Sequence, residues 1–218
     1  MQTADRRPIA ARGHPLARAI AAWLVRRQIS ANSISIFGLL CGLAAGLAFA
    51  ATHWVGAASA ALWLSGAVLI QLRLAANMFD GMVALERGIA SPVGELYNEI
   101  PDRISDSAVL IGAGVAGGNW GLGVAAALAA VATAYVRAAG KAAGAPSDFS
   151  GPMAKPQRMF LMTLMALWFS LAPVSWQPAL AGLTLPSLAL IVVIVGCIVT
   201  IPRRLRRIAG MLRRGDGA

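Results

Sequence analysis

Hydrophobic residues fall into long runs along most of the chain, and short polar stretches separate these runs. A helix of about 20 apolar residues is long enough to cross the roughly 30 Å of hydrocarbon in a bilayer. The pattern therefore predicts an all-α integral membrane bundle of six transmembrane helices. Their expected ranges are 32–51, 55–80, 93–116, 120–139, 159–171 and 180–201.

The third of these helices has the weakest hydrophobic pattern. Its first half carries four acidic residues, Glu95, Glu99, Asp102 and Asp106. A hydropathy window alone could miss this segment, and the topology would then be wrong. We include it because the apolar residues that follow complete a span of membrane length.

The ends of the chain differ from the apolar middle. Apolar residues recur at helical spacing among the basic residues of 1–31, without a small-residue cleavage site, and this pattern indicates an amphipathic helix on the membrane surface. We expect a six-helix transmembrane catalytic domain over 32–202 and a basic tail over 203–218.

Composition supports a membrane protein. The chain is 58% hydrophobic and only 13% charged, far from the balance of a soluble domain. Both cysteines, Cys41 and Cys197, lie in apolar runs, so a disulfide between them is not expected. A multi-pass protein of the cell membrane is expected, in particular of a bacterial inner membrane.

The basic residues predict the orientation. With six spans, the Lys and Arg residues fall on one side of the membrane, and the loops around His53, Asn119 and Ser175 on the other side hold none. Because cytoplasmic loops carry excess Lys and Arg, both termini are expected to be cytoplasmic. Topology and anionic lipid account for the net charge of +10, so no nucleic-acid partner is expected.

Six of the nine carboxylates are concentrated between Asp80 and Asp106. The second span ends near Asp80, a turn is expected at 88–91, and Pro92 suits the first position of a helix that Ser91 would cap. The acids therefore belong to a helical hairpin near the membrane surface, where the polar faces of two helices can oppose each other.

Opposed carboxylates in a setting of low dielectric repel each other unless a cation lies between them. Carboxylate and amide oxygens suit Mg²⁺ or Mn²⁺, and no His or Cys lies nearby to favour zinc. The hairpin therefore predicts a site for a hard divalent cation. Small residues at Gly81, Ala84 and Gly94 would let a ligand approach the backbone between the two helices.

The spacing D-G-x-x-A-x9-G-x7-D in this hairpin resembles the signature of the CDP-alcohol phosphatidyltransferases, membrane enzymes with the pattern D-x-x-D-G-x-x-A-R-x8-G-x-x-x-D-x-x-x-D. The stretch "ANSISIFG", which contains Asn32, is similar to the P-N-x-x-T stretch of the family. The resemblance also covers the six spans and the N-terminal surface helix.

The resemblance implies transfer of a phosphatidyl group from CDP-diacylglycerol to a small alcohol, with CMP leaving. Carried over by position, Asn77, Asp80 and Asn98 would face the metal, and Asp102 would be the catalytic base. Gly81, Ala84 and Gly94 would line the nucleotide pocket, with Asn32 nearby in the resembling stretch.

Three positions depart from the family pattern: Asn77 stands at the first Asp, Leu85 at the Arg and Asn98 at the third Asp. An amide oxygen still coordinates Mg²⁺, but without net charge it binds more weakly. Either the metal arrives with the nucleotide diphosphate, or neighbouring acidic residues supply the missing negative charge. These acidic residues are Glu95, Glu99 and Asp106. Including those possibilities, the candidate metal ligands are Asn77, Asp80, Asn98, Glu99, Asp102 and Asp106.

Basic residues provide candidates for phosphate binding. Arg87 or Arg73, on the same helix face as Asp80, could take the part of the Arg missing at Leu85. In the family, basic residues of the fourth cytoplasmic-facing region meet a phosphate on the acceptor. The candidates there are Arg137, Lys141, Lys155 and Arg158, so the acceptor alcohol could be phosphorylated.

Two other interpretations remain open. A family member that has lost catalysis could keep a lipid-binding, nucleotide-binding or regulatory role. Acidic residues inside a membrane also mark ion pathways in transporters, but the C-terminal half holds no second acidic hairpin of the kind that a repeated transporter fold would predict. A homodimer is compatible with either interpretation.

Overall fold

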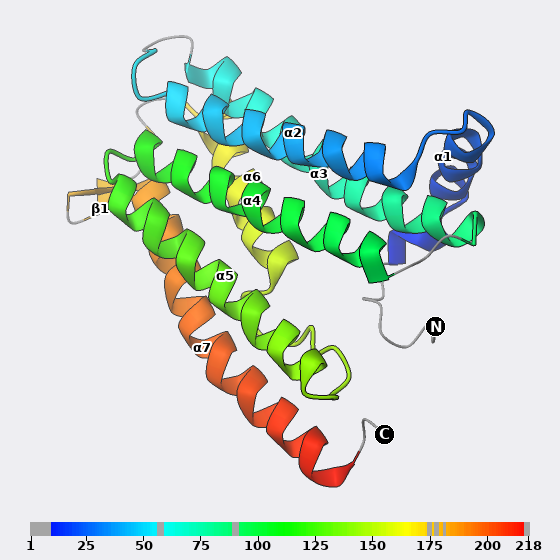
Figure 1. The fold of residues 1–218 in the computed structure, drawn as a ribbon. Helices are drawn as coiled ribbons and strands as arrows, with labels where there is room; N and C mark the ends of the chain where they lie inside the picture. The colour runs from blue at the N-terminus through cyan, green and yellow to red at the C-terminus, as the bar shows by residue number, and fades with distance from the viewer. Residues whose placement is uncertain are drawn as a thin grey trace.

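The computed structural model describes residues 10–55, 59–88, 92–173, 176, 179–180 and 182–215. These residues form a bundle of α-helices with two very short strands (Figure 1). In chain order the elements are η2 (Ala10–Gly13), α1 (Pro15–Arg26), α2 (Ala31–Ala51), α3 (Ser59–Glu86), α4 (Pro92–Ala116), α5 (Trp120–Ala142), α6 (Lys155–Leu171), β1 (Ala179–Leu180), β2 (Leu183–Thr184) and α7 (Leu185–Arg214).

Local sequence signals fix where several helices begin. The side chains of His14, Ser30 and Asn119 accept hydrogen bonds from backbone N–H groups in the first turns of α1, α2 and α5. Such caps satisfy donors that have no partner inside the helix. Pro156 lies in the first turn of α6, where the missing N–H of proline is not needed.

Each of the six predicted apolar segments lies largely in a helix, and the bounds differ by four residues or more at α3, α6 and α7. The last helix begins at Leu185, after the antiparallel β1 and β2, and not at Leu180. It continues through Pro202 to Arg214, so most of the predicted basic tail is a helical extension of α7. The predicted turn at 88–91 and the cap at Ser91 lie largely outside the described residues, although Gly88 has a positive φ of 65°.

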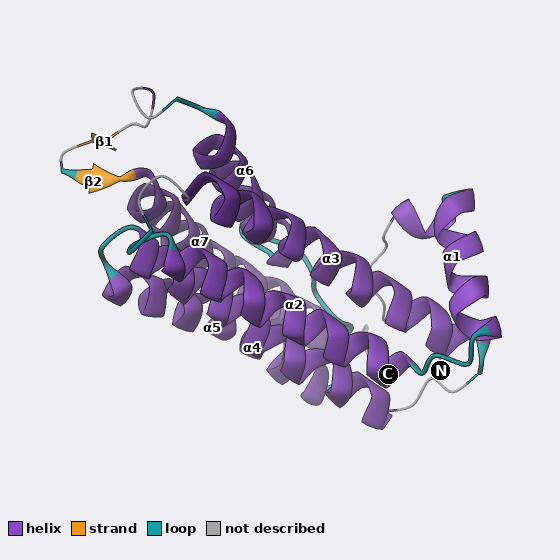
Figure 2. Ribbon diagram, turned by 90° about the horizontal axis from the view of Figure 1, so that it is seen from above, coloured by secondary structure: helices purple, strands orange, loops and turns teal. Residues whose placement is uncertain are grey.

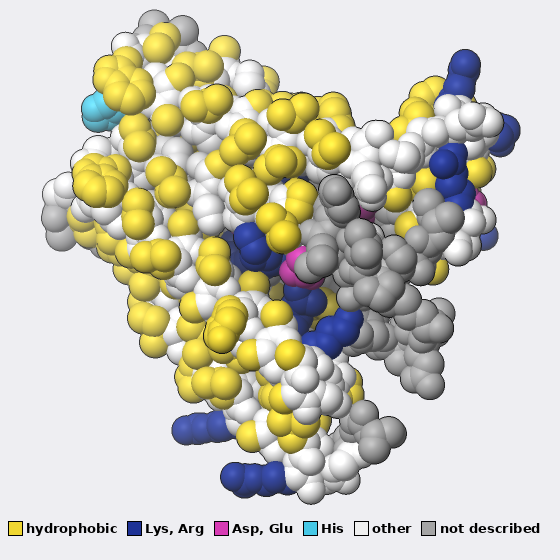
Figure 3. Space-filling model, in the orientation of Figure 1, with side chains coloured by type: hydrophobic (Ala, Val, Ile, Leu, Met, Phe, Trp, Pro, Cys, Tyr) yellow, Lys and Arg dark blue, Asp and Glu magenta, His cyan; other side chains and the backbone are white. Residues whose placement is uncertain are grey.

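Within the described residues, four helices are long and apolar enough to cross a membrane: α2, α3, α5 and α7. The first half of α4 is strongly charged, and α6 has only 17 residues, so neither meets the same criterion. Many large apolar side chains are exposed on the bundle, and hydrophobic side chains occupy much of the face seen in Figure 3. The protein is an all-helical, multi-pass membrane protein, whereas the count of six membrane crossings stays a prediction.

Helix α2 packs against both α3 and α4, and α5 packs against α4 and α7 (Figure 2). Glycines allow the close approach of α2 and α4. A methyl group added to Gly112 would lie 2.1 Å from the carbonyl oxygen of Gly46. No side chain fits in that space, so the glycine pair fixes how α2 and α4 lie against each other.

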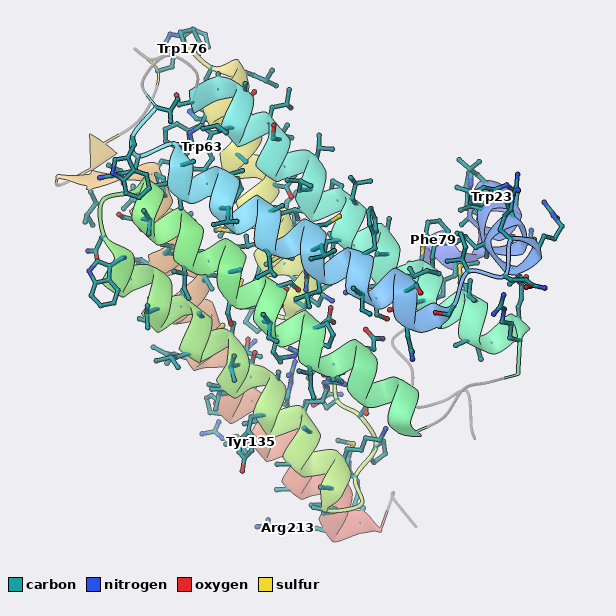
Figure 4. The ribbon with its side chains drawn as sticks, turned by 45° about the horizontal axis from the view of Figure 1, so that its top comes forward. Trp23, Trp63, Phe79, Tyr135, Trp176 and Arg213 are labelled. Carbon is teal, nitrogen blue, oxygen red and sulfur yellow. The ribbon has the colours of Figure 1, made fainter. Side chains whose placement is uncertain are left out.

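The two ends of the bundle differ. At one end, Trp63 packs between Phe49 and Phe169, with ring centroids 4.9 and 4.8 Å apart. Figure 4 shows Trp63 near this end and Arg213 at the opposite end of α7. Near the start of α2, α1 lies beside α3. Phe79 of α3 and residues of α1 pack against the same small buried cluster, which contains Ile34 and Val83. The predicted N-terminal amphipathic helix is therefore α1, docked on α3.

Candidate active site

Polar side chains of α3 and α4 meet inside the bundle. The contacting residues Asn77 and Asp102 are 25 positions apart in the chain. The amide nitrogen Nδ2 of Asn77 on α3 donates a hydrogen bond to Asp102 Oδ1 on α4. The sequence analysis assigned these two residues to the first and last positions of the motif. The structure thus brings the two ends of the motif into contact.

Asp80 lies one turn further along α3, and its side chain is buried. Its Oδ2 accepts a hydrogen bond of 2.7 Å from the Ser35 hydroxyl of α2. Its Oδ1 is buried and has no hydrogen-bond partner among the described residues. A buried acceptor without a partner is costly unless a ligand satisfies it, so this atom is the clearest candidate ligand for a cation.

Asp102 is held by three donors, two from α3 and one from α6. Its Oδ1 accepts from Asn77 and from Arg73 Nη2, the latter at 3.2 Å, and its Oδ2 pairs with Lys155 Nζ of α6. Its side chain is 12% exposed, so it can still be approached from one side. The contacts with two cations favour the ionised carboxylate, which is the form that can accept a proton.

Asp106, one turn after Asp102, is more deeply buried. Arg73 Nη2 lies 2.5 Å from its Oδ1, and Arg158 Nη2 lies 3.3 Å from its Oδ2. Arg158 also donates to the Met153 carbonyl at 2.9 Å and to the Thr133 hydroxyl at 3.3 Å. These contacts join α3, α4, α5 and α6 in one buried network of charges.

Glu99 lies at the more exposed edge of this network. It pairs with Arg103 at 2.9 Å, four residues along α4, and with Arg137 of α5. The guanidinium of Arg137 also lies 5.1 Å from the centroid of the Phe149 ring, so the loop after α5 takes part in holding it. Figure 3 shows Lys, Arg and acidic side chains in the middle of this face, between hydrophobic surfaces.

The other predicted site residues surround this network at different depths. Asn98 is half-buried one turn before Asp102, whereas Asn32, Gly94 and Lys141 are exposed. Gly81 and Ala84 are half-buried on α3. Leu85 is exposed, and Arg87 donates to the Val25 carbonyl at 3.3 Å, so it contacts α1. The side chain of Glu95 lies outside the described part of the structure.

The donor set fits a divalent cation in part. Among the described residues, no three acidic, His or Cys side chains form a group that could hold a metal ion. Asp102, Asp106 and Glu99 already pair with Arg or Lys side chains. Asp80, with its unpartnered oxygen, and the neighbouring Asn77 are hard oxygen donors, but too few to complete a coordination shell. A cation bound here would need further oxygens from its ligand.

Several polar partners in the network were not predicted from the sequence. Ser35, Ser105 and Thr133 each touch a charged side chain of the network. Ser35 carried a weak signal, because it belongs to the "ANSISIFG" stretch from which only Asn32 was chosen. Ser105 lies three residues after Asp102, but spacing alone does not distinguish it from Ser107.

Comparisons with known proteins give sequence relatives and structures with the same fold. No protein-family model matches the chain. The inner membrane protein YnbA of Escherichia coli K12 is 33% identical over 89 residues, which are 41% of this chain and 42% of that protein. A phosphatidylinositol phosphate synthase of Mycobacteroides abscessus is 26% identical over 170 residues, 75% of this chain and 71% of that protein.

Among solved structures, the fold matches phosphatidylinositol phosphate synthase of Mycobacterium tuberculosis. The form with CDP-DAG bound superposes with a TM-score of 0.72 at 22% identity, over 89% of this chain and 94% of that one. The complex with manganese and citrate gives 0.71 at 22% identity, over 88% of each chain. The fold, the sequence relatives and the motif from Asn77 to Asp102 agree in their similarity to the CDP-alcohol phosphatidyltransferases.

Proposed function

We propose that this protein transfers a phosphatidyl group from CDP-diacylglycerol to a small alcohol and releases CMP. The observation that carries the proposal is the contact between Asn77 and Asp102, which joins the two halves of the family motif around the buried Asp80. The name of the relative from Mycobacteroides abscessus and the CDP-DAG bound in the structural neighbour support the same reaction class.

Asp102 is the catalytic base in this proposal. Its ionised carboxylate accepts the proton of the acceptor hydroxyl, and the oxygen then attacks the phosphorus of the phosphatidyl group. A new P–O bond forms, the P–O bond to CMP breaks, and CMP leaves with the electron pair. Arg73 and Lys155 keep Asp102 charged and in place before the acceptor arrives.

The metal in the proposal is Mg²⁺ or Mn²⁺, in line with the manganese in the structural neighbour. Asp80 and Asn77 would hold it, and the diphosphate of the nucleotide would complete its oxygen ligands. Bound there, the ion would neutralise phosphate charge during the transfer. Asn98, Glu99, Asp102 and Asp106 were also predicted as ligands. A metal would have to displace protein cations from the last three.

The remaining residues would bind the substrates. Gly81, Ala84 and Gly94, with Asn32 and Arg87, would line the nucleotide side. Arg137, Lys155 and Arg158 pair with Glu99, Asp102 and Asp106, respectively. These three basic residues would attract a phosphate on the acceptor. Six spans over 32–202 with cytoplasmic ends would place these groups at the inner face of a bacterial inner membrane, in a monomer or a homodimer.

A CMP-release assay tests the proposal. The purified protein would receive CDP-diacylglycerol and a panel of alcohols, including inositol phosphate, glycerol phosphate and their unphosphorylated forms. The proposal predicts CMP release that depends on one acceptor, and loss of that release in Asp102→Asn. CDP-diacylglycerol that stays intact with every acceptor would contradict it, provided that the preparation binds CDP.

A second candidate is a protein that binds the nucleotide lipid but does not turn it over. The observation that favours it is the set of donors on Asp102, which occupies both of its carboxylate oxygens. Under this candidate, CDP would bind with ordinary affinity and CMP release would stay at background with every acceptor.

A further inference from the structure

We infer that Arg73 is a built-in cation of this site: its guanidinium takes the place between Asp102 and Asp106 where a divalent ion would otherwise bind, and leaves metal binding to the Asp80 side. The role of Arg73 in positioning the base rests on the proposed function. The claim about metal binding rests on contacts in the structure and is tested separately.

Arg73 is fully buried, and its contacts fix the guanidinium in one orientation. Its Nε donates to the Ser105 hydroxyl at 2.6 Å, and its Nη2 donates to the Asp102 carbonyl at 3.2 Å. The same Nη2 lies 2.5 Å from Asp106 Oδ1 and 3.2 Å from Asp102 Oδ1. One nitrogen therefore bridges two carboxylates, as a metal ion held between them would do.

Helix α2 leaves space for the side chain of Arg73 and its hydrogen bond to Ser105, because residue 42 is a glycine. A methyl group added to Gly42 of α2 would lie 2.9 Å from Arg73 Cδ and 2.3 Å from Ser105 Cβ. A side chain at Gly42 would therefore collide with both the stem of Arg73 and its hydrogen-bond partner. The close packing of α2, α3 and α4 is built around the buried arginine.

The charges of the cluster balance without a metal. The carboxylates of Asp80, Asp102 and Asp106 are matched by an equal number of cations. These cations are Arg73, Lys155 and Arg158, whereas Arg103, at 3.9 Å from Asp102 Oδ2, lies closer to Glu99, at 2.9 Å. A divalent ion added between Asp102 and Asp106 would meet Arg73 at contact distance, where repulsion between like charges is strong.

This balance also gives a physical reason for the amides in the motif. Two further carboxylates at Asn77 and Asn98 would leave the cluster with excess negative charge, which a metal would have to neutralise. With amides there, Arg73 suffices, and Asn77 becomes a hydrogen-bond donor to Asp102. Arg73 is thus a positioning residue that holds Asp102 in the absence of metal.

Binding of Mn²⁺ to the purified protein without nucleotide, followed by the EPR signal of free Mn²⁺, tests the inference. Arg73→Met would remove the cation that Asp102 and Asp106 share, so we expect one additional ion per chain and a gain of about tenfold or more in affinity over the native protein. Arg73→Lys keeps a positive charge and should show no gain. Arg213→Met removes one exposed charge at the far end of α7 and is the matched control.

An Arg73→Met protein that elutes as a single species and binds no more Mn²⁺ than the native protein would overturn the inference. An equal gain in Arg73→Lys would also overturn it, because the charge would then not be the cause. If Arg73→Met does not fold, Asp106→Asn decides. We expect it to leave Mn²⁺ binding in the presence of CDP unchanged, and a loss of that binding would show that Asp106 is a metal ligand.

These outcomes are separate from those of the activity assay. Native protein that releases no CMP would contradict the proposed function, but a gain of Mn²⁺ binding in Arg73→Met would still support the place of Arg73 in the site. Normal CMP release with no gain of binding would leave the proposed function standing and remove the inference.

Discussion

Lys155, in the first turn of α6, forms an ion pair with Asp102 in the middle of α4. The two residues are 53 positions apart in the chain. The pair connects the proposed base directly to the group of basic residues proposed to bind the acceptor. A phosphate on the acceptor would compete for Lys155, so binding of the acceptor would release one oxygen of Asp102 to take the hydroxyl proton.

The first prediction follows from this pair. Lys155→Ala should raise the KM for a phosphorylated acceptor by about tenfold or more, because a hydrogen bond to a charged group contributes about 1.5–3 kcal/mol. The KM for CDP-diacylglycerol should change much less. Steady-state CMP release at varied concentrations of each substrate measures both values, with Arg213→Ala as the control. Equal changes for the two substrates would contradict a specific role in acceptor binding.

The second prediction concerns the metal. The polar centre offers oxygen ligands, so CMP release should require Mg²⁺ or Mn²⁺ and should stop in excess EDTA. Adding back Mg²⁺ should restore it, which separates metal removal from denaturation. Full turnover in EDTA, with residual metal shown to be negligible by mass spectrometry, would contradict the prediction.

The third prediction separates Asp80 from Asp102. Asp80→Asn should weaken binding of Mn²⁺ and CDP, since it removes the charge of the carboxylate whose Oδ1 is without a partner. Asp102→Asn should leave CDP binding largely intact and lower turnover by the roughly 10² to 10⁴ typical of a lost general base. For each of the two variants, the affinity for CDP and the rate of CMP release are measured in parallel. If Asp102→Asn turns over normally, Asp106 or Glu99 becomes the candidate base.

The fourth prediction concerns the amides at Asn77 and Asn98. Without nucleotide, the native protein should bind Mn²⁺ weakly, and CDP should raise the affinity strongly because its diphosphate supplies oxygen ligands. Mn²⁺ must then raise the affinity for CDP by the same factor. The double variant Asn77→Asp, Asn98→Asp should bind Mn²⁺ more tightly without CDP and show weaker coupling.

A charge-matched control for that variant is Asn119→Asp with Gln28→Glu, which adds two carboxylates at exposed positions outside the cluster. Titrations of Mn²⁺ with and without CDP compare the three proteins. Tight binding of Mn²⁺ by the native protein without CDP would instead mean that neighbouring acids such as Glu99 and Asp106 already complete the site.

The fifth prediction concerns the packing of α2 on α4. Gly112→Ala places a methyl group 2.1 Å from the carbonyl oxygen of Gly46, so the two backbones must separate. Overpacking of this kind costs about 1–3 kcal/mol, and we expect a lower midpoint of thermal unfolding in detergent. Gly121→Ala is the control, because its new methyl group would lie no closer than 3.5 Å to a neighbouring atom. Equal midpoints for the two variants would contradict the proposed packing role.

The sequence by itself determined the helical elements of this protein. Helices and turns follow local rules of apolar run length and capping, so the six apolar segments were found with errors mainly at their ends. The motif spacing identified Asp80 and Asp102 as a pair because both lie on polar faces of neighbouring helices. The beginning of α7 was misplaced because the chain first forms β1 and β2, and neither strand carries a strong signal in two residues.

Only the tertiary structure decided which side chains meet. The contacts of Asp80 with Ser35 and of Asp106 with Arg158 join residues 45 and 52 positions apart. They depend on how each helix is rotated and how closely it approaches its neighbour, and glycines such as Gly46 and Gly112 set that approach. Helical periodicity places a residue on a face, but it does not specify the partner of that face, because the partner depends on the packing of the whole bundle.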